Sequence, residues 1–163
     1  MRGLVHLFVF LGLLFPCVAL AQQTARFEQS DVAAIDQLIE RYNQAFSVRD
    51  YVKLKDYLQA PFVGFAPFLG FGNVLSMDGV VDAYKVLREG LDAQQYQRST
   101  LVRRQITALS NDRALVNGVY RRYRKDGSVL VEGALVYLVT KSSGTWRLCG
   151  ILAQDMSEFG KLY

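Results

Sequence analysis

The chain has 163 residues, a formal net charge of +4 and a single histidine, His6, and 51% of its residues are hydrophobic. This length suits one domain with one hydrophobic core. If residues 1–21 are removed on export, the 142 remaining residues carry a charge of +3 and no histidine. Their composition excludes a Ser-His-Asp or Cys-His triad, a histidine acid or base, and a histidine-ligated metal site.

The N-terminus has the layout of a secretory signal peptide. A positive start containing Arg2 precedes an almost wholly apolar stretch over 4–15, and the small-x-small pattern Ala19-Leu20-Ala21 follows. The sequence therefore predicts cleavage after Ala21 and a periplasmic or secreted protein without membrane attachment after cleavage.

Two alternatives exist for this segment. A membrane anchor would need about 20 apolar residues, more than this stretch offers. A lipoprotein signal requires a small residue before its cysteine, whereas Pro16 precedes Cys17.

After cleavage Cys149 has no partner in its own chain, and a buried, inert thiol is favoured over an exposed reactive thiol or an intermolecular bridge.

Apolar spacing predicts three helices in the first half of the chain. After a flexible lead-in over 22–30, Ser30 or Asp31 is expected to cap a helix that ends near Ser47. A second, shorter helix follows, with Asp50 as its cap and Pro61 as its stop. Ser76 is the expected cap of a third helix. The apolar stripes of the first and third helices consist of Val32, Ile35, Leu38, Ile39, Tyr42 and Phe46, and of Val80, Val81, Tyr84, Leu87 and Leu91.

An aromatic, glycine-rich segment over 62–77 separates the second helix from the third. It predicts two short strands or a covering loop. Its phenylalanines, Phe65 and Phe68 among them, would form either an apolar lid over a pocket or a plug in the core. Either arrangement favours an apolar or amphipathic ligand, if there is one.

Alternating residues predict an antiparallel meander in the second half. Helices followed by strands are typical of an α+β fold, and we place one domain over 31–157 with a C-terminal tail over 158–163. The expected strands cover 101–109, 114–124, 129–140 and 145–153, with turns at 110–112, 125–128 and 142–144.

This order resembles the nuclear-transport-factor-2-like (NTF2-like) superfamily, with its SnoaL-like and DUF4440-like members. The resemblance is carried by the segment 39–46 with Asp50, by the hairpin 123–128, and by 137–140 with 144–147. It implies a cone, in which a strongly curved antiparallel sheet wraps over the N-terminal helices and leaves a pocket at the open end. It also implies a homodimer that forms through the sheet.

The steroid isomerases of this superfamily use a tyrosine and two aspartates. Tyr42 occupies the position of the tyrosine, as a ligand contact or as a core residue with a locally bonded hydroxyl. The positions of the two acids fall near Phe65 and Val136, where no carboxylate stands, so we reject that activity. The epoxide hydrolases of the fold use an Asp-Arg-Asp set, and here only Glu132 and Asp155 are available as acids on the strands.

The strand over 114–124 carries the most distinctive polar residues. Arg122 and Tyr120 share one face, and Gly118 on that face would leave space for a ligand. The functional interpretation is an anion-binding wall in which Arg122 holds a carboxylate or phosphate. The alternative is a hairpin end whose charges face water, which is favoured for Arg124 and Lys125. Periodicity does not say which face is concave.

We therefore predict a non-catalytic binder of a small apolar or amphipathic ligand, or a protein-interaction module, without cofactor or metal. The alternatives are a SnoaL-like lyase, isomerase or hydrolase that uses tyrosine, arginine and one carboxylate, and a structural dimer whose own phenylalanines fill the pocket. No nucleic-acid partner is expected, because the charge is low and the basic residues form no single basic helix. The candidate pocket residues are Tyr42, Phe46, Phe65, Phe68, Tyr120, Arg122, Glu132 and Tyr137.

Overall fold

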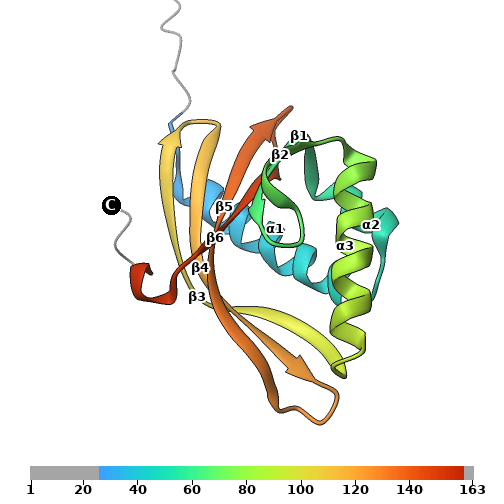
Figure 1. Ribbon diagram of the computed structural model, residues 1–163. Helices are drawn as coiled ribbons and strands as arrows, with labels where there is room; N and C mark the ends of the chain where they lie inside the picture. The colour runs from blue at the N-terminus through green and yellow to red at the C-terminus, as the bar shows by residue number, and fades with distance from the viewer. Residues whose placement is uncertain (1–25, 160–163) are drawn as a thin grey trace, which may run out of the picture.

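The computed structural model describes residues 26–159. The predicted signal peptide over 1–21 and residues 160–163 of the tail lie outside the described residues. Three helices and six strands follow in the order α1, α2, β1, β2, α3, β3, β4, β5, β6, and a 3₁₀ turn, η1 (Met156–Glu158), closes the described part. Figure 1 shows the long strands curving around α1, with α3 beside β1 and β2.

The helix α1 (Gln29–Ser47) begins earlier than expected, inside the predicted lead-in. The prediction that Ser30 or Asp31 is its N-cap is wrong, because Glu28 takes that position. Asp31 is instead the third residue of the helix, and its carboxylate accepts a hydrogen bond of 3.0 Å from the backbone N–H of Glu28. The two residues form a capping box, which satisfies backbone donors at the start of the helix. The predicted end near Ser47 is confirmed.

The caps of the other two helices are confirmed. The Asp50 carboxylate accepts from the backbone N–H of Lys53 at the start of α2 (Tyr51–Asp56), and the Ser76 hydroxyl accepts from that of Gly79 at the start of α3 (Met77–Asp92). The prediction that Pro61 stops α2 is wrong. The helix ends at Asp56, because the chain already enters the sheet at Leu58, and Pro61 lies inside that strand.

The sheet contains the predicted meander and two further strands. Its spatial order is β2-β1-β6-β5-β4-β3, and all neighbours are antiparallel except β1 and β6, which run parallel. The segment 62–77 provides strand structure rather than a covering loop. The strands are β1 (Leu58–Ala66), β2 (Gly70–Leu75), β3 (Tyr96–Ser110), β4 (Arg113–Arg124), β5 (Val129–Ser142) and β6 (Thr145–Gln154).

The predicted α+β cone is therefore confirmed as a curled, mixed sheet that does not close, with helices against its concave side. The core lies between α1, α3 and this side of the sheet. It buries Ile39 and Phe46 of α1, Tyr84 of α3, and Val116 and Tyr137 of the sheet. Within residues 26–159, no helix combines the length and apolarity that a membrane crossing requires.

Two buried charges hold α1 in place. At its start, the Asp31 carboxylate accepts from the Lys141 ammonium at 2.7 Å and from the Trp146 indole N–H at 2.9 Å. At its end, the guanidinium of Arg88 on α3 donates to the carbonyls of Phe46 and Ser47, at 3.1 and 2.6 Å. Both ends of the helix are thus tied to other elements, which sets the position of its inner face against the sheet.

The thiol of Cys149 on β6 is half-buried and donates to the Leu138 carbonyl at 3.5 Å. Burial raises the pKa of this thiol above its usual value. A raised pKa lowers the thiolate fraction at neutral pH, which favours the inert thiol over the reactive one.

Candidate functional site

A small cavity of about 30 Å³ lies between α1, α3 and the concave side of the sheet, and we call it the inner pocket. A cavity of this size has room for about one water molecule or for one small polar group. Aromatic side chains dominate its wall. The inner pocket is lined by Tyr42, Asn43, Phe46, Phe68, Tyr84, Leu87, Ser99, Tyr120, Arg122, Leu135, Tyr137 and Ile151.

Six of the eight predicted pocket residues meet in this cavity, namely Tyr42, Phe46, Phe68, Tyr120, Arg122 and Tyr137. The structure places the other two elsewhere. Phe65 is 43% exposed on β1 and is not among the lining residues. Glu132 on β5 lies opposite Arg121 of β4 and forms an ion pair with it, on the face of β4 that points away from the inner pocket.

Three buried tyrosines, Tyr42, Tyr84 and Tyr137, line the inner pocket. The hydroxyls of Tyr42 and Tyr84 share a hydrogen bond of 2.6 Å, and the rings of Tyr42 and Tyr137 meet edge to face at 5.8 Å between centroids. Burial raises the pKa of all three hydroxyls well above the usual value, because the charged phenolate loses its hydration. The hydroxyls therefore stay protonated at neutral pH and serve as neutral hydrogen-bonding groups rather than as bases.

Arg122 is the one formal charge among the residues that line the inner pocket. Its guanidinium lies 4.9 Å from the centroid of the Tyr120 ring, and its Nε is buried without a hydrogen-bond partner. No ion pair or hydrogen bond within residues 26–159 neutralises this guanidinium. By contrast, Arg124 sits at the hairpin end and donates to the Val129 carbonyl at 2.8 Å, in an exposed position.

Two glycines of the sheet, Gly118 and Gly133, make room for the protein's own side chains. A Cβ on Gly118 would lie 2.8 Å from a methyl carbon of Leu101, so the expectation that Gly118 leaves space for a ligand is wrong: Leu101 fills it. A Cβ on Gly133 would lie 2.6 Å from the Tyr120 hydroxyl. Gly133 therefore leaves the space that the Tyr120 ring occupies, and this ring in turn contacts the Arg122 guanidinium.

Sequence reasoning did not assign Tyr84, Asn43 or Ser99 to the pocket. Tyr84 was expected only as part of the apolar stripe of the third helix. A signal was present, since a tyrosine in an apolar stripe brings a hydroxyl that needs a partner once it is buried. Ser99 lies in the part of β3 that the sequence did not assign to a strand, so no periodicity placed it on the inner face.

The inner pocket is suited to binding an anion and lacks the usual groups for acid–base chemistry. Among the described residues that line it there is no carboxylate, histidine or cysteine. Asp155, the second acid considered from the sequence, caps η1 and accepts from the backbone N–H of Ser157 at 2.8 Å. Within residues 26–159, no cluster of three His, Cys, Asp or Glu side chains is arranged to hold a metal ion.

Comparison with solved structures finds the same fold in several bacterial proteins. A cystatin-like-fold protein of unknown function from Nostoc punctiforme superimposes with a TM-score of 0.66 at 11% identity, covering 84% of this chain and 99% of its own. An NTF-2-like protein of unknown function from Shewanella oneidensis gives 0.61 at 19% identity, covering 76% and 98%. A protein from Catenulispora acidiphila in complex with S-DNPA gives 0.61 at 13% identity, covering 80% and 97%.

A search of the curated proteins finds no match to this chain. The profile of the family described as NTF2-like protein (DUF6841) matches residues 29–156, which span α1 to the beginning of η1 and hence nearly all of the described structure. The chain therefore belongs to this NTF2-like family.

Proposed function

We propose that this protein is a non-catalytic binding protein for a small amphipathic anion, whose carboxylate is held by Arg122 in the inner pocket. One observation carries the proposal. The Arg122 guanidinium stands among aromatic rings with a buried Nε, and no group in the described part of the chain pairs with it. An unpaired charge in such surroundings is costly, and a carboxylate that forms charge-assisted hydrogen bonds removes this cost.

The chemistry of the wall supports an anion that carries apolar carbons next to its charged group. The tyrosine hydroxyls are protonated and can donate to an oxygen, while Phe46, Phe68 and Leu135 offer only apolar surface. A guanidinium forms two parallel hydrogen bonds with a carboxylate, and Arg122 supplies the one positive charge that neutralises it. A bound small molecule also has a precedent in this fold, since the Catenulispora protein was solved in complex with S-DNPA.

Calorimetric titration of the purified protein with hexanoate tests this proposal, with hexanol as the uncharged counterpart. Hexanoate should bind and hexanol should not, and the Arg122→Met variant should lose at least about tenfold in affinity. Arg121→Met is the matched control. Arg121 directly precedes Arg122 on the same strand, points to the other face of the sheet and pairs with Glu132. Hexanoate recovered unchanged after long incubation would agree with binding without turnover.

Equal hexanoate affinity in the wild type and in Arg122→Met would contradict the proposal. The enzyme alternative required one carboxylate beside tyrosine and arginine. Glu132 is engaged by Arg121 outside the inner pocket, and Asp155 caps η1, so neither supplies that group where the tyrosines meet.

We also propose that the protein is exported after cleavage behind Ala21 and that it forms a homodimer through its sheet. The first proposal rests on residues 1–21 and the second on the family resemblance. N-terminal sequencing of the protein from its producing cells should begin at Gln22, and a start at Met1 would contradict export. Light scattering should give twice the chain mass, and a monomer mass at high concentration would contradict the dimer.

A further inference from the structure

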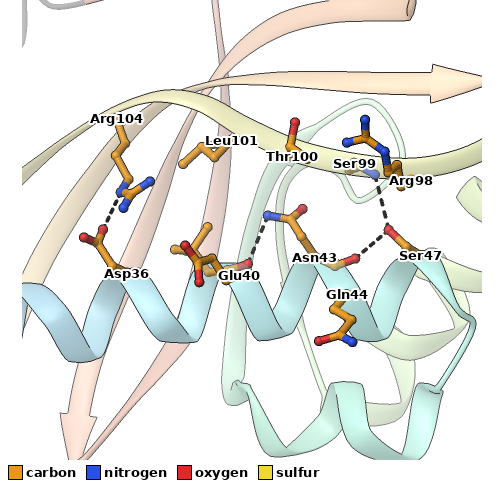
Figure 2. A pocket seen from close by; sticks show the side chains of 11 residues that line it. Asp36, Glu40, Asn43, Gln44, Ser47, Arg98, Ser99, Thr100, Leu101 and Arg104 are labelled. Carbon is orange, nitrogen blue, oxygen red and sulfur yellow. Dashed lines mark hydrogen bonds and ion pairs between the residues drawn. The ribbon is translucent and has the colours of Figure 1, made fainter. Parts of the chain in front are cut away.

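A larger cavity of about 430 Å³ lies between α1 and the edge strand β3, and we call it the side groove. Figure 2 shows Asp36, Glu40 and Asn43 projecting from α1 toward β3. This volume falls in the range of about 300 to 1,000 Å³ that small-molecule sites occupy. The side groove is lined by Asp36, Ile39, Glu40, Asn43, Gln44, Ser47, Arg98, Ser99, Thr100, Leu101 and Arg104.

The side groove and the inner pocket are neighbours, because Asn43 and Ser99 line both. Asn43 is 8% exposed, and its side-chain N–H donates to the Ile39 carbonyl at 3.0 Å. The backbone N–H of Ser99 donates to the Ser47 hydroxyl at 3.2 Å (Figure 2). Asn43 and Ser99 thus mark the place where the two cavities adjoin.

The side groove has an apolar base and charged rims. Ile39, which is 2% exposed, and Leu101 form apolar parts of its wall. At one end Arg104 forms an ion pair with Asp36 across the groove, and at the other end Arg98 stacks on the Tyr123 ring at 3.8 Å. The arginines of the rim are thus already engaged, whereas Arg122 of the inner pocket is not.

The two cavities differ in volume and can therefore hold different parts of a ligand. The inner pocket, at about 30 Å³, accommodates a carboxylate-sized group but not the body of an amphipathic molecule. The side groove is more than ten times larger, and Leu101 with the buried Ile39 gives it an apolar base against which an alkyl or similar chain can pack.

We infer that the two cavities form one site for an elongated amphipathic carboxylate, whose head lies at Arg122 and whose chain passes Asn43 into the side groove. This inference rests on the proposed function and extends it by naming the ligand class and the place of its chain. It assigns a recognition role to the α1–β3 face, with the chain against Ile39 and Leu101.

Titration with butanoate, hexanoate and decanoate tests this inference. Each buried methylene contributes roughly fourfold in affinity, so decanoate should bind at least about tenfold more tightly than hexanoate. Glu40→Trp places a ring at the rim of the groove and should abolish this gain while butanoate affinity stays unchanged. Gln37→Trp is the control for the ring, since Gln37 is exposed on α1 and does not line the groove, and Glu40→Gln is the control for the lost charge.

A second measurement needs no variant. Decanoate should shift the methyl resonances of Ile39 and Leu101, and butanoate should leave them in place. Loss of binding in Arg122→Met with no dependence on chain length would overturn the side-groove inference and leave the proposed function standing. A chain-length gain that Glu40→Trp does not reduce would also overturn it, because the chain would then lie elsewhere. Binding that is indifferent to Arg122→Met would remove the proposed function itself.

Discussion

Asp31 and Arg122 are charged residues that each contact an aromatic side chain, but they differ in the partners that the fold gives them. The Asp31 carboxylate accepts three hydrogen bonds, from Lys141, Trp146 and the backbone of Glu28. The Arg122 guanidinium has one ring contact, to Tyr120, and no counterion within residues 26–159. The fold supplies hydrogen-bond partners for Asp31, whereas it leaves the Arg122 guanidinium available to a ligand.

This difference distinguishes a charge that stabilises the fold from a charge that is available to bind a ligand. A buried ion pair with all its hydrogen bonds made ties elements together, and removal of one partner is destabilising. Arg122 is half-buried, and its buried Nε without a partner lowers the stability of the fold, so a role in folding does not account for this residue. Removal of the Asp31 charge should therefore lower the free energy of unfolding, whereas removal of the Arg122 charge should raise it and weaken ligand binding.

Asp31→Ala should have the largest effect. It leaves the Lys141 ammonium and the Trp146 indole without their acceptor, and it should lower the free energy of unfolding by about 3 kcal/mol. Urea denaturation measures this loss. Asp36→Ala is the control, because its pair with Arg104 is part-exposed and should contribute at most about 1 kcal/mol. Equal losses in the two variants would erase the distinction between the buried and the exposed pair.

Acid should remove the Asp31 contribution without a mutation. The hydrogen bond from Lys141, aided by those from Trp146 and Glu28, lowers the pKa of Asp31 from 3.8 to about 2. Because the pKa is lower in the folded state, the stabilisation is present above pH 4 and is lost as the pH falls toward 2. It amounts to about 2 kcal/mol. Urea unfolding between pH 2 and 6 should show this decrease in the wild type and a smaller one in Asp31→Asn. Parallel curves would exclude Asp31 as its source.

Arg122→Met should act in the opposite sense. It removes an unpaired charge and keeps an apolar chain of similar length, so the free energy of unfolding should rise by about 1 kcal/mol. The same variant should lose hexanoate binding. Thermal unfolding in ligand-free buffer measures the stability change. A clear decrease would mean that Arg122 is paired in solution and would place it in the same class as Asp31.

The tyrosine pair should show a similarly small effect on stability. Tyr42→Phe and Tyr84→Phe each remove one hydroxyl from their shared hydrogen bond, which should cost about 1 kcal/mol in either variant. The double variant should lose less than the two single losses together, because each single change leaves the other hydroxyl without this partner. Additive losses in the urea experiment would show that the two hydroxyls are not coupled.

The sequence alone determined the local elements of this protein. The apolar stripe from Ile35 to Phe46 and the caps at Asp50 and Ser76 are local signals, and turn residues such as Asp126-Gly127 end strands regardless of what lies across the sheet. Apolar residues that recur about every 3.6 residues indicated the helices, and those that recur every two residues indicated the meander. Together with the family resemblance, they also indicated the cone and six of the residues around the inner pocket.

Only the tertiary structure decided which face of each strand points inward. Alternation along β4 puts Arg121 and Arg122 on opposite faces, but it does not show which face is concave, because a period of two is the same for both. The curl of the sheet around α1 turns Arg122 toward the tyrosines and leaves Glu132 with Arg121. Distant partners such as Leu101, which fills the space at Gly118, come together only through strand register, a long-range property that no local pattern contains.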